Sequence, residues 1–153
     1  MNKKGFTLVE LLIVVAIIGI VAAIAIPNLL TALQKGKQKS TMGDMKTVGN
    51  SVDSYITDWS MAPVDAGNVQ ASLDHDWFRP FYIKVVPNTD AWGTLFDYES
   101  QASELDDYSI ISWGRNKTDN GIPAPALYDV TSMSDFNFNI FFSNGIGQRL
   151  DIV

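Results

Sequence analysis

The sequence predicts an α+β fold in which one long N-terminal helix packs on a small C-terminal antiparallel sheet. Residues 6–33 contain 22 apolar residues out of 28, and their only ionisable side chain is Glu10. Apolar residues then recur at spacings of three and four as far as Trp59, which is the period of a helix with one buried face. Short segments rich in aromatic and β-branched residues follow in the C-terminal part, as is typical of strands.

The first half of the predicted helix has the length and composition of a membrane span. At ~1.5 Å per residue, residues 6–33 would extend roughly 42 Å, which exceeds the bilayer core. The alternative is a buried core helix, but a chain of 153 residues could hardly cover such a helix on every face. Lys3 and Lys4 precede the span and are expected to stay in the cytoplasm. Residues 34–153 would then form a globular domain on the outer side.

Composition excludes several classes of protein. Residues 40–153 carry 16 acidic and 6 basic side chains, a balance of -10 that disfavours a nucleic-acid partner. A short basic segment, Lys35-Gly-Lys37-Gln-Lys39, separates this region from the apolar run. The chain has no cysteine and therefore no disulfide. Nucleotide-binding and hydrolase motifs are absent, and His75 is better explained as a solvated residue than as a general base, so we expect no enzyme activity.

The second half of the helix and the loop after it are predicted from apolar spacing and from proline. The helix should present an apolar stripe to a core and end near Met61, because Pro63 disfavours helical geometry just before it. A short helix is expected around residues 69–73, followed by an irregular segment whose aromatic side chains anchor it on the sheet. The stripe comprises Met45, Val48, Val52, Tyr55, Ile56 and Trp59, and the anchors are Trp77, Phe78, Phe81 and Tyr82.

Three strands are predicted at residues 95–98, 108–113 and 136–142. In the third, apolar residues alternate from Phe136 to Phe142, which indicates one strongly apolar face. We expect a turn at residues 143–145 and a returning fourth strand within residues 147–153.

Glu10 requires an explanation, because a carboxylate in hydrocarbon costs a few kcal/mol or more unless it is paired. It could lie near the membrane interface and reach water. The other interpretation needs a positive partner, and residues 6–33 contain none. Cleavage after Gly5 would create a free α-ammonium on Phe6, with which Glu10 of a neighbouring copy could pair.

The stretch KGFTLVELLIVVAIIG at residues 4–19 resembles the start of the type IV pilin and type II secretion pseudopilin superfamily. The resemblance implies that residues 1–5 form a leader, that prepilin peptidase cuts after Gly5, and that the new amine of Phe6 is methylated. It also implies that Glu10 assists processing and subunit docking, and that residues 6–33 pack as a filament core. Pro27 matches a helix-bending proline and favours a kink or a locally melted turn.

A second set of motifs resembles the major pseudopilins of type II secretion systems. These are Asp90-Ala91-Trp92-Gly93, the segment 108–114, and the segment 135–145. The resemblance implies a homo-oligomeric helical filament that grows from the inner membrane into the periplasm. Before assembly, each subunit would be held in the membrane lipid. Its further partners would be an inner-membrane assembly platform and minor pseudopilins. Two alternatives stay open: a type IV pilin forming a surface filament for adhesion, motility or electron transfer, and a membrane-anchored enzyme or ligand-binding domain.

The same resemblance implies a calcium-binding loop. Residues 115–134 form a long predicted loop that contains glycine, proline and several side chains with hard oxygen ligands, which calcium prefers. The candidate ligands are Asn116, Asp119, Asp129 and Asp135. The alternative is a solvated loop in which Asn and Asp serve turns.

Overall fold

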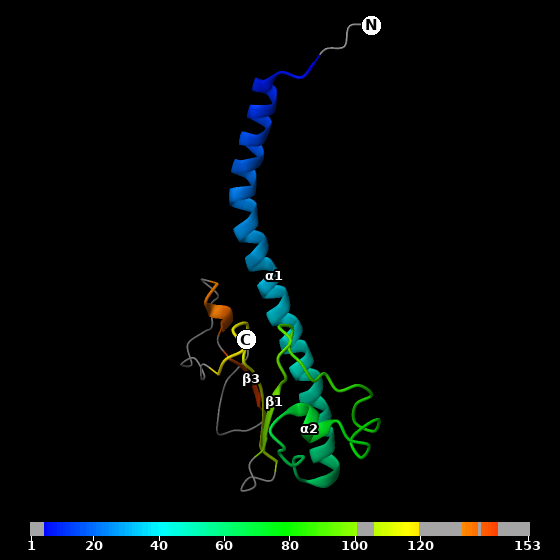
Figure 1. The fold of residues 1–153 in the computed structure, drawn as a ribbon. Helices are drawn as coiled ribbons and strands as arrows, with labels where there is room; N and C mark the ends of the chain where they lie inside the picture. The colour runs from blue at the N-terminus through cyan, green and yellow to red at the C-terminus, as the bar shows by residue number, and fades with distance from the viewer. Residues whose placement is uncertain (1–4, 101–105, 120–132, 138, 144–153) are drawn as a thin grey trace. The chain divides into compact units, whose positions relative to one another are not determined.

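The computed structural model describes residues 5–100, 106–119, 133–137 and 139–143. The chain divides into two compact units, residues 1–35 and 36–153, and helix α1 (Leu8–Trp59) contributes residues to both. The second unit also contains α2 (Val69–Leu73), β1 (Asp97–Ser100), β2 (Tyr108–Ser112), the 3-10 helix η1 (Asp135–Asn137) and β3 (Ile140–Ser143). The predicted fold class, a long apolar helix followed by a small antiparallel sheet, is confirmed (Figure 1).

In the first unit the helix is continuous through Pro27. Proline removes one backbone donor, and nearby the Thr31 hydroxyl donates to the Pro27 carbonyl oxygen at 3.0 Å. Because residues on both sides of Pro27 keep helical geometry, the predicted alternative of a locally melted turn is wrong. One missing donor is not enough to unwind a helix made of strongly apolar, helix-compatible residues.

The core of the second unit forms where α1 packs on the sheet. Met45, Val48 and Val52 are fully buried on α1, one helical turn apart, as the apolar stripe predicted. They join one cluster with β1 and β2 residues that include Tyr98, Tyr108 and Ile110. Tyr55 and Ile56 pack at the edge of this cluster. The stripe stops there, because Trp59 is 62% exposed, and the prediction that Trp59 faces the core is wrong.

The sheet has the strand order β1-β2-β3, and both pairs are antiparallel. Tyr98 lies opposite Ile110, and Ile110 lies opposite Phe142, so these three residues share one register line. The second predicted strand is confirmed within one residue, whereas β1 starts two residues later than expected.

The third predicted strand begins too early. Residues 135–137 form the 3-10 helix η1, in which the Asn137 amide donates to the Ser134 carbonyl oxygen at 3.0 Å. Phe136 is buried, but it belongs to this 3-10 helix and not to a strand. The alternating pattern holds only in β3, where Ile140 and Phe142 pack against the core. The predicted turn after Ser143 and the fourth strand lie outside the described residues.

The aromatic segment after α2 contacts α1. The ring of Tyr55 lies beside Trp77, Phe78 and Tyr82, with centroids 5.4, 5.9 and 5.3 Å apart. Phe78 is fully buried, but Phe81 is 79% exposed. The prediction that Phe81 anchors this loop on the sheet is therefore wrong, since sequence composition does not show which ring of an aromatic run turns inward.

Candidate functional site

The N-terminus of α1 is closed by a capping box between Thr7 and Glu10. The Glu10 amide donates to the Thr7 hydroxyl at 3.2 Å, and the Thr7 amide donates to Glu10 Oε2 at 2.8 Å. The Thr7 hydroxyl donates to the same oxygen at 2.7 Å. A capping box satisfies backbone donors that the first helical turn leaves unpaired. Within one copy, Glu10 therefore caps its own helix.

The predicted cleavage position lies just outside this cap. Gly5 and Phe6 precede the helix, both are exposed, and the Phe6 side chain is 76% exposed. A peptide bond outside regular structure is open to a protease, whereas a helical one must first unfold. The sequence motif pointed to Gly5, Phe6 and Glu10 but not to Thr7, although the spacing Thr-x-x-Glu was readable as a capping box.

From Leu8 to Leu33, α1 exposes its large apolar side chains on every face. They include Leu8, Leu12, Ile18, Ile24, Leu30 and Leu33, which are between 46% and 81% exposed. This part of the helix is long and apolar enough to cross a membrane, and none of the apolar stretch is buried within the chain. Such a surface is stable in lipid or against other helices, so it is a surface for insertion or assembly.

The turn at Asp90 is organised by one buried carboxylate. Asp90 Oδ1 accepts from the amides of Trp92 and Thr94 at 2.9 and 2.8 Å, while Oδ2 accepts from the Ser112 hydroxyl at 2.8 Å. Gly93 adopts a positive φ of 82°, which a residue with a side chain rarely does. The Ala91 amide donates to the buried Thr41 hydroxyl on α1 at 3.1 Å. This motif therefore links the turn to β2 and to α1.

The predicted calcium ligands occupy different places. Asn116 and Asp119 are exposed in the turn after β2, and Asp135 opens η1. Asn116 Oδ1 accepts from the Thr118 amide at 3.3 Å, and Asp119 Oδ1 accepts from Asn139 at 2.7 Å. Asp129 lies outside the described residues. Within the described ranges, no three acidic or histidine side chains gather around one point.

One carboxylate near this region was missed. Partial burial raises the pKa of Asp97 on β1, and the negative charges of Asp119 and Asp65 raise it further, while a hydrogen bond with Trp113 opposes them. Asp97 and Asp119 are therefore close enough to repel each other. Only the fold brings them together, because they are separated by a whole strand and no spacing rule links them.

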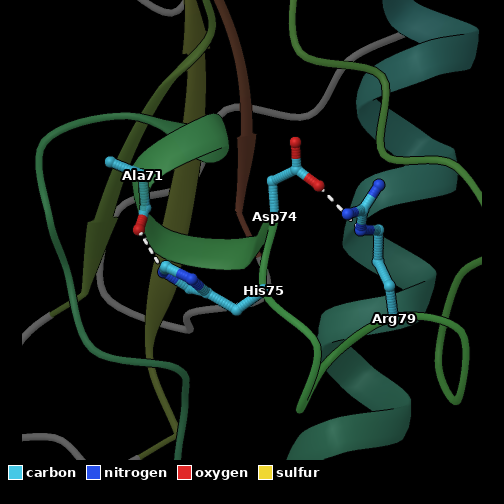
Figure 2. A network of polar contacts seen from close by, with 4 residues as sticks. All are labelled: Ala71, Asp74, His75 and Arg79. Carbon is cyan, nitrogen blue, oxygen red and sulfur yellow. Dashed lines mark hydrogen bonds and ion pairs between the residues drawn. The ribbon is translucent and has the colours of Figure 1, made fainter.

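His75 has a local structural contact. Its Nε2 lies 2.8 Å from the Ala71 carbonyl oxygen, at the C-terminal end of α2, and the neighbouring Asp74 forms an ion pair with Arg79 at 2.7 Å (Figure 2). The prediction that His75 is a surface residue is confirmed, since it is exposed.

Comparison with protein families distinguishes between the two candidate classes of filament subunit, type IV pilins and type II secretion pseudopilins. Residues 1–26 match the model of the prokaryotic N-terminal methylation motif. Residues 28–131, which include the Asp90 turn and the first two strands, match the model of type II secretion system protein G. The chain belongs to the protein G family of type II secretion systems.

Curated relatives in the protein G family agree with this assignment. A type II secretion system core protein G from Aeromonas hydrophila is 29% identical over 131 residues, which cover 79% of this chain and 91% of the relative. The core protein G of Vibrio cholerae is 33% identical over 106 residues, covering 65% and 72%. That of Pseudomonas aeruginosa is 28% identical over 124 residues, covering 74% and 87%. No solved structure matches the chain significantly.

Membership in the protein G family confirms the resemblance to pseudopilins. It indicates a structural role in type II secretion. The apolar helix is consistent with anchoring of such a protein in a membrane. The Asp90 turn, which distinguished this class in the sequence, lies before β1 and contacts Thr41 on α1 and Ser112 on β2.

Proposed function

We propose that this chain is a structural subunit of the type II secretion pseudopilus, a filament that helps to push folded proteins across the outer membrane. One observation carries the proposal: a folded acidic unit continues from a helix whose large apolar side chains are exposed on every face. A surface of this kind requires lipid before assembly and other helices afterwards. The chain itself acts by polymerising, and it performs no catalysis.

Residues 1–5 are a leader that prepilin peptidase removes by cutting after Gly5, with methylation of the new amine on Phe6. The exposure of Gly5 and Phe6 and the start of the helix at Leu8 support the cleavage position. The helix beyond it anchors the subunit in the inner membrane with its N-terminus in the cytoplasm. Residues 34–153 face the periplasm, and the inner-membrane platform and minor pseudopilins are the remaining partners.

Glu10 has two successive roles in this proposal. Before assembly it caps its own helix through Oε2. After cleavage, the Phe6 amine of a neighbouring copy provides the positive charge that the apolar segment lacks. A paired carboxylate is far less costly in an apolar filament core than an unpaired one.

We also propose that calcium tethers the loop after β2. The support is the loop's supply of hard oxygen ligands and the repulsion between Asp97 and Asp119, which a divalent cation would relieve. Asn116, Asp119, Asp129 and Asp135 are the ligands predicted from the sequence, and Asp97 is a carboxylate whose pKa is raised by burial and by the charge of Asp119.

Mass spectrometry and electron microscopy of the full chain, expressed with its secretion machinery, test the main proposal. The mature chain should begin at methylated Phe6, and Glu10→Ala should be correctly folded but form no filaments. An intact Met1 on the membrane-anchored protein, or normal filaments from Glu10→Ala, would contradict it.

Two further variants separate the charge of Glu10 from its capping role. Glu10→Gln keeps an oxygen that can accept from Thr7 but removes the charge, so it should also fail to assemble. Thr7→Ala removes the cap's hydroxyl and keeps the carboxylate, so it should still form filaments, with a cost to the helix of about 1 kcal/mol. The mature mass of every variant must be checked, so that a failure of processing is not mistaken for a failure of assembly.

A further inference from the structure

An exposed aromatic surface lies at the C-terminal end of α1 in the second unit. It consists of Tyr55, Trp59, Trp77 and Tyr82. The Tyr55 ring is central, with centroids 6.1 Å from Trp59, 5.4 Å from Trp77 and 5.3 Å from Tyr82. Trp59 is 62% and Trp77 is 46% exposed. Two large rings thus stay partly open to solvent although each contacts Tyr55, which indicates a contact surface rather than a core.

The segment of the chain that carries this surface is also acidic. Residues 53–82 contain five aspartates and one arginine, and that arginine, Arg79, is paired with Asp74 (Figure 2). The Asp58 carboxylate accepts from the Tyr82 hydroxyl at 3.0 Å, and Trp59 Nε1 donates to the same hydroxyl at 3.0 Å. Indole faces beside carboxylates attract cationic side chains, because the ring quadrupole and the negative charge act in the same direction. The preferred partner is therefore rich in lysine or arginine.

The same helix carries a matching partner. The lysine segment, Lys35 to Lys46, holds four exposed lysines and one aspartate. Among the described residues, the only ion pair joins Asp74 and Arg79, so none of these lysines forms an ion pair with a described carboxylate.

One chain cannot bring these two surfaces together. Lys37 and Trp59 belong to the same continuous helix, and their separation along it is about 33 Å at ~1.5 Å per residue. The lysine segment can therefore reach an aromatic surface only on another copy.

We infer that, in the filament, the aromatic surface of one copy receives the lysine segment of a second copy that is shifted by about 33 Å along the helix direction. This inference rests on the proposed function, because it requires copies of α1 to lie side by side. It specifies a second register, different from the shift of about one helical turn that a pair between Glu10 and the Phe6 amine of a neighbour implies.

Disulfide cross-linking in assembled filaments tests the register directly, because the chain has no cysteine of its own. Two versions of the chain, Lys37→Cys and Asp76→Cys, are expressed together, and oxidation should yield a covalent dimer only when both are present. The matched control replaces Asp76→Cys with Asn50→Cys, an exposed position on α1 that corresponds to a shift of only ~20 Å. Dimers through Asn50 and not Asp76, or a cross-link from Asp76 to a different protein, would overturn the inference.

A charge exchange tests the attraction. Lys37→Glu should lower the yield of filaments roughly tenfold at equal expression, and Asp76→Lys in the same chain should restore most of it. Lys117→Glu makes the same charge change in the turn after β2 and should leave the yield unchanged. If Lys37→Glu assembles normally, the inference is wrong although the proposed function stands. If the parent chain forms no filaments, the proposed function fails first.

Discussion

The ring of Phe142 on β3 lies against the backbone of Gly49 on α1, in the space that a side chain at position 49 would occupy. A Cβ placed there would come within 2.6 Å of Cζ and 2.8 Å of Cδ1 of that ring. The same helical turn receives the hydroxyl of Tyr108, which lies 2.9 Å from the Gly49 carbonyl oxygen and 2.8 Å from Asp53 Oδ1. Close packing of the helix on the sheet therefore depends on a residue without a side chain.

Gly49→Ala should destabilise the folded chain by about 1 to 3 kcal/mol, because the added methyl overpacks the contact with Phe142. Gly43→Ala is the matched control. It lies on the same helix with open space around it, so it should stabilise the chain by ~1 kcal/mol through helix propensity. Thermal unfolding of the detergent-solubilised full chain measures both. A stabilising Gly49→Ala would show that the contact is not tight.

Asp90→Ala should cost about 3 kcal/mol, because the amides of Trp92 and Thr94 and the Ser112 hydroxyl lose their acceptor in a buried turn. Asp90→Asn keeps one oxygen for the two amides and should lose only ~1 kcal/mol. Denaturant unfolding of both variants provides the comparison. Equal losses would mean that the charge, and not the acceptor geometry, holds the turn.

Asp97→Asn should stabilise the chain near neutral pH, and the gain should shrink as the pH falls. Burial and the charges of Asp119 and Asp65 raise the pKa of Asp97 in the folded state, so its ionised form is disfavoured by folding. The resulting destabilisation is present above the folded pKa and disappears as Asp97 becomes protonated in both states. Melting temperatures in the presence of a chelator test this. A gain that does not change with pH would refute the electrostatic cause.

Calcium should raise the melting temperature of the chain, and a chelator should reverse the effect, if the loop after β2 binds it. Asp119→Ala should abolish most of this shift. Asp76→Ala removes an exposed carboxylate from a different part of the second unit and should leave it intact. A melting temperature that is the same with calcium and with chelator would remove the calcium proposal.

The described residues show which parts of the fold follow from local patterns. The apolar run and the helical stripe from Met45 to Val52 depend on neighbours within one or two turns, so the sequence alone predicts them. Helix α2 and β2 are found at the predicted places for the same reason. The Thr7–Glu10 cap is equally local, but it was not predicted. The start of β3 was misplaced because the alternating pattern gives the same signal in a strand and in the buried turn η1 that precedes it.

What the sequence by itself determined is the class of the protein: an apolar helix long enough to cross a membrane, followed by an acidic domain of the protein G family. The tertiary structure decided which residues meet. Three interactions join positions that are far apart in the chain, and no periodicity encodes such pairs. They are Phe142 with Gly49, Ser112 with Asp90, and Asp119 with Asp97. The tertiary structure also turned Trp59 outward, since the part of α1 that packs on the core ends at Tyr55 and Ile56.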